Sequence, residues 1–298
     1  MKSRLIHKIQ SQFAYGHLEI LLEYFGLPRN NVLLGVLQHG AGTAEMLLRD
    51  SKTPRIGASK LPHLVWSKAV AKELRNYGDK SAISIGSPWA YLLASQKPSS
   101  TIVEKREKSI IYFPTHHSLS VDRNLNTEEF RSRLLKLKKQ FPTERLIVCL
   151  YYSEFLIREL HVVAEEEGVS LVCPGISGWD QLWTPHPARV NFLKNLYSIL
   201  AEAERVIFES FTTGIFYAAS LNKKILYQPS LGNQEIKTLS LEHEIQRNWM
   251  DNSMFSRNEF VGVDEYLEVV DYMLGLRDIL SKEELFSVIK IKPFDFLF

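Results

Sequence analysis

Hydrophobic positions along this chain follow two alternating patterns, one typical of buried strands and one typical of helices. Short apolar runs such as residues 146–150 do not alternate with polar residues, which is the pattern of a strand whose two faces are both covered. Longer segments between these runs carry apolar residues at helical spacing. Strands that alternate with helices predict an α/β fold with parallel sheets covered by helices.

The N-terminal part of the chain shows this alternation in short elements. A helix is expected over residues 5–25, because apolar residues recur at helical spacing and the Gly-Leu-Pro sequence at 26–28 is a stop signal. A strand is expected over residues 31–37, a helix over 67–77 and a second strand over 82–85. Both strands end at polar turns that contain glycine, so the pattern predicts a small α/β domain.

A break in the pattern separates two domains. Residues 95–108 are rich in Ser, Lys and Glu, include Pro98 and show no apolar period, which is typical of a linker. We therefore expect an N-terminal domain over residues 1–100 and a second domain over residues 101–275. Residues 276–298 are expected to form a C-terminal segment that packs back on the N-terminal domain.

The second domain continues the alternation with greater regularity. Its strands are expected over residues 109–113, 145–150, 169–173, 205–208 and 224–227. Its helices are expected over residues 127–140, 155–167, 189–202 and 213–219. Ligands of such sheets gather at the carboxyl ends of the strands, so the polar turns that follow these strands are predicted to form one site.

The polar turn at residues 209–214 is the most informative of these turns. An apolar strand stops at hydroxyl residues and a glycine just where a helix begins, which leaves backbone N–H groups and the positive end of a helix dipole facing outward. Such a turn can hold a phosphate, although Ser and Thr are also ordinary helix caps, and capping alone explains the residues. The candidate binding residues in this and the other turns are Thr115, His116, His117, Ser118, Tyr151, Ser210, Thr212, Thr213 and Gly214.

Composition and charge narrow the classes of function. The chain has 298 residues, of which 45% are hydrophobic, and a net charge of +2 from 36 basic and 34 acidic residues, so it can bury a large core and does not have the charge of a nucleic-acid binder. Its two cysteines, Cys149 and Cys173, have no neighbouring ligand cluster, so no structural disulfide or zinc site is expected. With no signal peptide or spanning segment in view, a cytoplasmic location is expected, or a peripheral one on the cytoplasmic membrane face.

Several of these turns resemble those of a known family. The motifs are Gln38-His39-Gly40, Gly86-Ser87-Pro88, residues 111–115, and residues 209–213 followed by 224–227. A chain of two α/β halves with these turns resembles the GT-B glycosyltransferases. Within that group the motifs resemble those of bacterial surface-polysaccharide transferases, namely the CDP-glycerol glycerophosphotransferases and the capsule sialic-acid and Kdo transferases. The resemblance implies two Rossmann-like domains that face each other across a cleft, with the nucleotide donor in the C-terminal half and the acceptor in the N-terminal half.

The resemblance also assigns roles to residues. Thr212 and Thr213 match the hydroxyl pair that lies near the donor phosphate in those families, and His39 matches the turn histidine of the N-terminal half. One motif departs from the family pattern. The His-Pro pair that often follows the second strand of the donor domain is replaced here by Tyr151-Tyr152-Ser153, while His186-Pro187 occurs later, in a Trp-bearing segment.

Transfer of a sugar requires a base for the acceptor hydroxyl. His39 is the best candidate, because imidazole titrates near neutral pH and a strand-end turn is exposed to a cleft; a histidine that only braces the turn is an equal alternative. Glu45 either orients His39, acts as the base itself, or is an ordinary surface carboxylate on a helix. On the acceptor side we place Gln38, Gly40 and Arg55, although Arg55 is most simply a solvated loop charge. No essential metal or other cofactor is expected, since no DxD-like carboxylate pair is present and GT-B enzymes need not use one.

These observations predict a metal-independent, inverting glycosyltransferase that moves a sugar from a nucleotide donor to a glycan or lipid-linked glycan acceptor in surface-polysaccharide synthesis. The resembled families favour a CMP-linked nonulosonate or Kdo as donor. The alternatives are a non-hydrolysing UDP-sugar 2-epimerase and a non-catalytic scaffold in capsule assembly. No nucleic-acid partner is expected. Peripheral contact with the inner membrane is an alternative role for the basic residues 136–139 or for the apolar residues 294–298.

Overall fold

The computed structural model describes residues 9–49, 61–96, 108–115, 126–176, 191–229, 248–250, 253, 259–261 and 266–293. The chain divides into two compact units. Unit 1 comprises Met1–Ser99, Ser177–Leu193 and Leu267–Phe298, and unit 2 comprises Ser100–Ile176 and Lys194–Tyr266. Each unit contains a parallel sheet with helices packed on it, which confirms the predicted α/β class.

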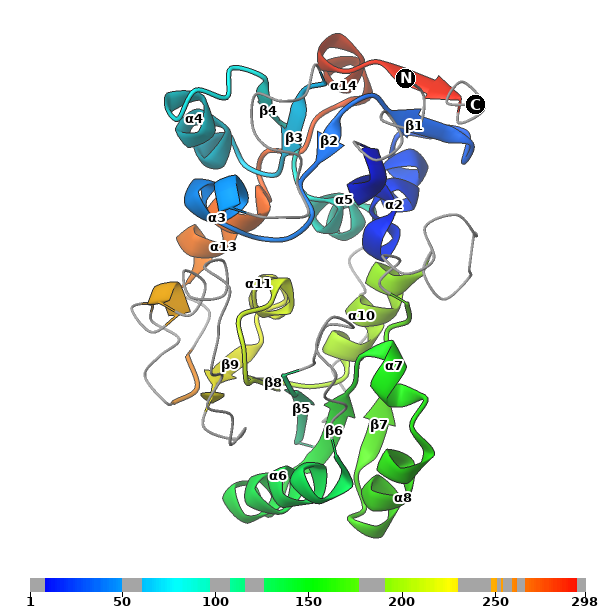
Figure 1. The fold of residues 1–298 in the computed structure, drawn as a ribbon, viewed down its shortest axis with the longest axis vertical. Helices are drawn as coiled ribbons and strands as arrows, with labels where there is room; N and C mark the ends of the chain where they lie inside the picture. The colour runs from blue at the N-terminus through cyan, green and yellow to red at the C-terminus, as the bar shows by residue number, and fades with distance from the viewer. Residues whose placement is uncertain are drawn as a thin grey trace. The chain divides into compact units, whose positions relative to one another are not determined.

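The sheet of unit 2 has five strands in the order β7-β6-β5-β8-β9 (Figure 1). All four neighbouring pairs are parallel. The strands are β5 (Ser109–Phe113), β6 (Arg145–Cys149), β7 (Ser170–Val172), β8 (Arg205–Phe208) and β9 (Lys224–Tyr227). The chain adds strands outward from β5 in one direction and from β8 in the other, so the strand order reverses between β5 and β8. This reversal is a topological switch point, where doubly wound sheets bind their ligands.

Helices of unit 2 pack on this sheet through apolar stripes. They are α6 (Thr127–Gln140), α7 (Tyr152–Phe155), α8 (Arg158–Glu166), α11 (Thr213–Ser220) and α10 (Phe192–Ala201), which lies in unit 2 from residue 194 onward. Asn126 caps α6 by accepting a hydrogen bond from the Glu129 backbone N–H at 2.7 Å. Helices α6 and α8 lie side by side (Figure 1) and enclose the main core with β5 and β6. The single helix predicted over residues 155–167 is wrong, because Ile157 has an extended backbone that ends α7 and begins α8.

The sheet of unit 1 is smaller and is built of parallel strands in the order β2-β3-β4. These strands are β2 (Val36–Leu37), β3 (His63–Val65) and β4 (Ala82–Ser84). A separate antiparallel pair joins β1 (Asn31–Leu33) to β10 (Ile291–Pro293). The single strand predicted over residues 31–37 is therefore wrong: Leu34 and Gly35 interrupt it, and its two parts pair with different partners. The sequence pattern did not predict strand β3.

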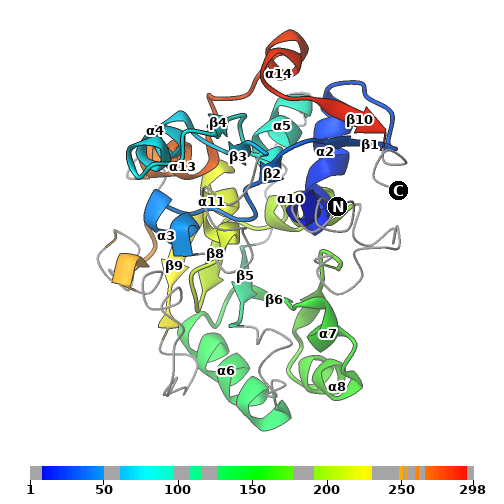
Figure 2. The same cartoon turned by 45° about the horizontal axis from the view of Figure 1, so that its top comes forward.

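Helices of unit 1 include segments from both ends of the chain. They are the 3-10 helix η1 (Gln10–Gly16), α2 (His17–Tyr24), α3 (Ala44–Arg49), α4 (Lys68–Asn76), α5 (Pro88–Ser95), α13 (Leu267–Leu274) and α14 (Lys282–Val288). The continuous helix predicted over residues 5–25 is interrupted at Ala14 and Tyr15, which have non-helical backbone angles. Helix α13 packs beside α4 (Figure 2), where the Tyr272 hydroxyl donates to the Glu73 carboxylate at 2.7 Å. Among the described residues, no helix combines the length and apolar character needed to span a bilayer.

Candidate functional site

A buried carboxylate joins the carboxyl ends of β5 and β8 in unit 2. Glu209 follows β8 directly, and its side chain is fully buried. The carboxylate accepts hydrogen bonds from the Tyr112 hydroxyl on β5, from the Thr115 backbone N–H at 2.8 Å and from the Arg133 guanidinium on α6 at 2.8 Å. Burial raises the pKa of Glu209, while Arg133, Tyr112 and Thr115 act to lower it. This network lies at the switch point of the sheet.

Arg133 supplies the positive charge of this network. Its side chain is 2% exposed and also pairs with Glu129, one helical turn earlier, at 2.5 Å. Burial alone lowers the pKa of Arg133, but the carboxylates of Glu209 and Glu129, together with Tyr112, raise it above its ordinary value, so the guanidinium stays charged. Its Nε–H is buried and has no hydrogen-bond partner among the described residues. The guanidinium is therefore held between two carboxylates on one side of the sheet.

A second buried carboxyl group lies at the carboxyl end of β6. Glu154 on α7 is 4% exposed, and it accepts a hydrogen bond from the Tyr151 backbone N–H at 3.4 Å. Burial raises its pKa to about 7, with a further upward contribution from the negative charge of Glu209, while the Tyr151 N–H and Arg133 act to lower it. Glu154 can therefore hold or release a proton near neutral pH. The sequence pattern indicated this turn but not the buried position of Glu154 within it.

The turn before α11 follows the predicted strand-to-helix pattern. Thr212 has an extended backbone and is the N-cap of α11, where its Oγ1 accepts a hydrogen bond from the Gly214 N–H at 3.4 Å. Thr213 begins the helix, and Gly214 is buried against the Phe208 ring. Ser210, Thr212 and Thr213 are half-buried. Capping, the simpler interpretation of this turn, is thus present: the Gly214 N–H donates to the Thr212 hydroxyl and the Ile215 N–H donates to the Thr212 carbonyl at 3.1 Å. The attraction of this turn for an anion therefore rests on the helix dipole.

The candidate residues of unit 1 lie at the carboxyl end of β2. Gln38 is buried and braces the turn: its side chain accepts the Trp66 backbone N–H at 2.9 Å and donates to the Gly40 carbonyl at 2.8 Å. His39 is half-buried and stacks on Tyr15 with ring centroids 5.2 Å apart. Because the Oε1 and the Nε2 of the Gln38 side chain both bind backbone groups, its geometry is that of a structural brace for the turn that carries His39.

Glu45 is exposed in the first turn of α3. Four further candidates fall outside the described residues, namely Arg55, His116, His117 and Ser118, as do the segments 179–187 and 294–298. Within unit 2 the structure brings Thr115 and the turn at 209–214 together through Glu209. Tyr151 lies at the end of the neighbouring strand β6.

A buried histidine that sequence analysis missed packs on the same tyrosine as His39. His17 is fully buried at the start of α2, between Tyr15 and the edge of Trp66, with ring centroids 5.7 and 5.9 Å away. Neither ring nitrogen of His17 has a hydrogen-bond partner within the described part of the chain. Burial lowers its pKa to about 3, so the imidazole is neutral at pH 7. Its position within an apolar helical pattern gave no signal of this environment.

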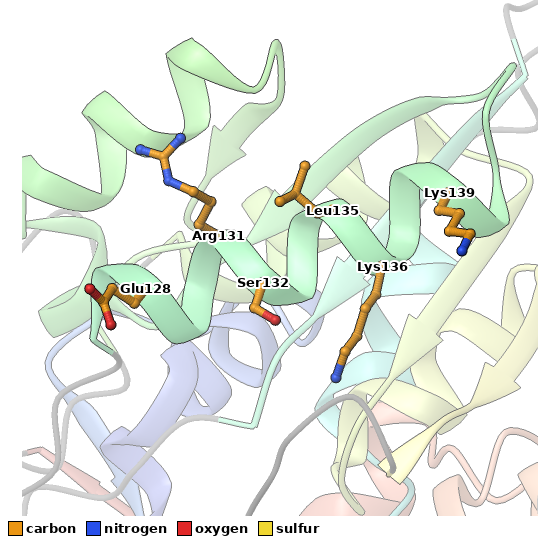
Figure 3. A pocket seen from close by; sticks show the side chains of 6 residues that line it. All are labelled: Glu128, Arg131, Ser132, Leu135, Lys136 and Lys139. Atoms are coloured by element: carbon orange, nitrogen blue, oxygen red, sulfur yellow. The ribbon is translucent and has the colours of Figure 1, made fainter.

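A shallow hollow lies on the surface of α6, apart from the turns at the strand ends. Its lining residues all come from this one helix, as Figure 3 shows, and are Glu128, Arg131, Ser132, Leu135, Lys136 and Lys139. Arg131 pairs with Glu166 at the end of α8 and with its C-cap Glu167, which fixes the guanidinium along the helix pair. Leu135 is 49% exposed. Because all of its lining comes from one helix, this hollow lacks the enclosed polar groups of a small-molecule site.

Comparison with known proteins gives matches among solved structures. No protein-family model and no curated protein matches the chain. Among solved structures, UDP-bound MnaA of S. aureus matches at 13% identity and a TM-score of 0.35, over 74% of this chain and 61% of that one.

Two further structures match over similar parts of the chain. A UDP-GlcNAc 2-epimerase from Neisseria meningitidis bound to UDP-GlcNAc matches at 13% identity and a TM-score of 0.35, over 76% of this chain and 58% of that one. A TarM mutant of S. aureus in complex with fondaparinux, alpha-GlcNAc-glycerol and UDP matches at 11% identity and a TM-score of 0.33, over 76% of this chain and 42% of that one. The chain thus spans less than two thirds of each of these proteins, and similarity at this level assigns no activity.

Proposed function

We propose that this protein is a nucleotide-sugar-dependent glycosyltransferase whose donor phosphate binds at the switch point of unit 2. One observation carries the proposal: the turns after β5 and β8 are joined through Glu209 at the point where the strand order reverses. Helix α11 begins at Thr213, directly after its N-cap Thr212, so its N-terminus lies in the same turn that Glu209 opens. Polar turns at a switch point and a helix N-terminus beside them are the two features that favour phosphate binding.

The proposed chemistry divides between a base and an anion site. As the acceptor hydroxyl attacks the anomeric carbon it loses a proton, and negative charge builds on the departing nucleotide phosphate. The positive end of the α11 dipole and the hydroxyls of Thr212 and Thr213 would stabilise that charge. His39 is the proposed base, and Glu45 its alternative. Charge stabilisation by a helix N-terminus needs no metal, so we expect chelators to leave activity unchanged.

The finer assignment concerns the donor and the acceptor. The resemblance of the turn motifs to capsule sialic-acid and Kdo transferases favours a CMP-linked donor and a surface glycan or lipid-linked glycan as acceptor. Ser210 and Thr115 would lie nearest the phosphate among the other turn residues, because they flank the Glu209 network. Peripheral attachment to the cytoplasmic membrane face would bring such an enzyme to its acceptor.

A thermal-shift panel tests this proposal. CMP, CDP, UMP, UDP and GDP are added to the wild type, to a Thr212→Ala, Thr213→Ala double variant, and to Thr143→Ala, a control at an exposed residue before β6. A ligand that binds only the folded state raises the melting temperature. We expect one nucleotide to stabilise the wild type and the control but not the double variant. If no nucleotide shifts the wild type, the glycosyltransferase proposal fails and the scaffold alternative gains.

A further inference from the structure

We propose that Glu209 is a positioning residue that holds the Thr115 backbone and the turn at residues 209–214 in one fixed arrangement, so that the donor phosphate meets a preformed site. This inference rests on the proposed function of unit 2. Glu209 itself is fully buried and does not reach a ligand. It acts through the backbone of Thr115 and through the turn that it begins, residues 209–214.

Three separate segments donate to the one carboxylate. Tyr112 belongs to β5, Thr115 to the loop that follows β5, and Arg133 to the middle of α6. The Glu209 backbone N–H also donates to the Phe113 carbonyl at 3.3 Å, which continues the β5–β8 pairing by one residue. Side chain and main chain therefore tie the two strand ends together on both sides of the switch point.

Stability alone is a poor explanation for this network. A buried ion pair costs desolvation of both charges, and apolar replacement of the whole pair is often neutral or stabilising. The ion pair also lies at the carboxyl end of β8, against the hydroxyl of the core residue Tyr112, at the edge of the sheet where such folds bind ligands. A role in fixing the geometry of the loops accounts for both the chemistry and the place of Glu209.

These two explanations give different results in a double variant. Glu209→Leu alone leaves Arg133 without one of its two carboxylates, so we expect a lower melting temperature. Glu209→Leu with Arg133→Met removes both charges together, and we expect the melting temperature to recover toward that of the wild type. The Thr115 N–H has no carboxylate acceptor in either variant, so the Thr115 backbone stays unanchored.

The experiment measures three quantities on the full chain: the melting temperature, hydrogen exchange of the Thr115 amide, and the Kd of the nucleotide that stabilises the wild type. In the double variant we expect faster Thr115 exchange and a Kd raised about tenfold or more, the scale of one lost charged hydrogen bond. Glu209→Gln, which keeps an acceptor oxygen, should restore part of the affinity. Glu204→Gln is the matched control, because Glu204 forms an exposed ion pair with Lys224 at 2.9 Å in the same unit.

The outcomes separate this inference from the proposed function. A folded double variant that binds nucleotide as tightly as the wild type, or that keeps slow Thr115 exchange, overturns the positioning role and leaves the proposed function standing. A wild type that binds no nucleotide overturns both. If the double variant does not fold, Tyr112→Phe removes one donor without changing charge, and unchanged Thr115 exchange together with unchanged affinity in that variant and in Glu209→Gln contradicts the inference.

Discussion

Two buried polar sites, one in each unit, respond to burial in different ways. In unit 2, Glu209 and Arg133 are buried as charges, and each is held by several hydrogen-bonding partners. In unit 1, His17 is buried among aromatic rings, is neutral, and neither ring nitrogen has a hydrogen-bond partner among the described residues. A buried charge persists only where opposite charge and donors compensate its desolvation, and a lone titratable group loses its charge instead.

The two units also differ in the order of the strands in their sheets. The strand order of unit 2 reverses between β5 and β8, while the order β2-β3-β4 in unit 1 follows the chain without reversal. Only the first arrangement creates a switch point within its sheet. The charged network of unit 2 therefore lies where the fold itself favours a ligand, whereas the strand ends of unit 1 are filled by Gln38, Trp66 and aromatic side chains.

The largest expected effect concerns close packing at the strand ends of unit 1. Gly275 has φ +57°, and a Cβ there would lie 1.9 Å from the Trp66 carbonyl oxygen. Gly275→Ala should lower the free energy of unfolding by more than about 4 kcal/mol, because the backbone at Trp66 or at residue 275 must move to make room for the added methyl group. Gly168→Ala in unit 2 is the control: its φ is +62° but nothing lies within 4 Å, so it should cost only about 1–2 kcal/mol. Equal losses of unfolding free energy in urea would show that the contact with Trp66 is not decisive.

The next effect concerns His17 and acid. Its pKa is about 3 in the folded state against 6.5 in the unfolded chain, so the unfolded state binds the extra proton and stability falls as pH drops from 6.5 toward 3. Two pH units below 6.5 this loss is about 3 kcal/mol. His17→Phe should lack this part of the acid sensitivity, measured as the difference in unfolding free energy between pH 7 and 4.5. An unchanged pH dependence in the variant would show that His17 is not buried neutral.

A smaller effect of opposite sign is expected in unit 2. The pKa of Glu154 is about 7 in the folded state against an ordinary value of 4.5, so the folded state holds the extra proton and stability falls as pH rises from 4.5 to 7. Over that window the loss is at most about 3 kcal/mol. Glu154→Gln should remove this dependence. The same unfolding series at pH 4.5 and 7 measures it, and a slope equal to that of the wild type would argue against a raised pKa.

The regular part of unit 2 could be predicted from sequence because each element carries its own signal. Strands β5, β8 and β9 are apolar runs bounded by polar turns, and α6 has a cap at Asn126 with apolar residues at helical spacing. The turn residues of the candidate site followed from the rule on strand carboxyl ends. Their link through Glu209 could not, because it depends on which residue of α6 faces the sheet and on the register of β5 against β8.

Unit 1 was harder to predict for a different reason. Strand β1 pairs with β10 near the other end of the chain, so nothing local separates it from β2. Strand β3 has three residues, too few to show a period. The break before α2 comprises Ala14, Tyr15 and the N-cap Gly16; the glycine suits its φ of +73°, but the φ of +54° at Tyr15 is one that its residue type does not predict.

The location of nucleotide binding tests the central claim most directly. Backbone amide NMR of the full chain, recorded during titration with the nucleotide that gives the largest thermal shift, reports which residues meet the ligand. We predict the largest shift changes at Ser210, in the first turn of α11 and at Thr115. Changes confined to unit 1, or none in the turns after β5 and β8, would contradict a donor site at the switch point of unit 2.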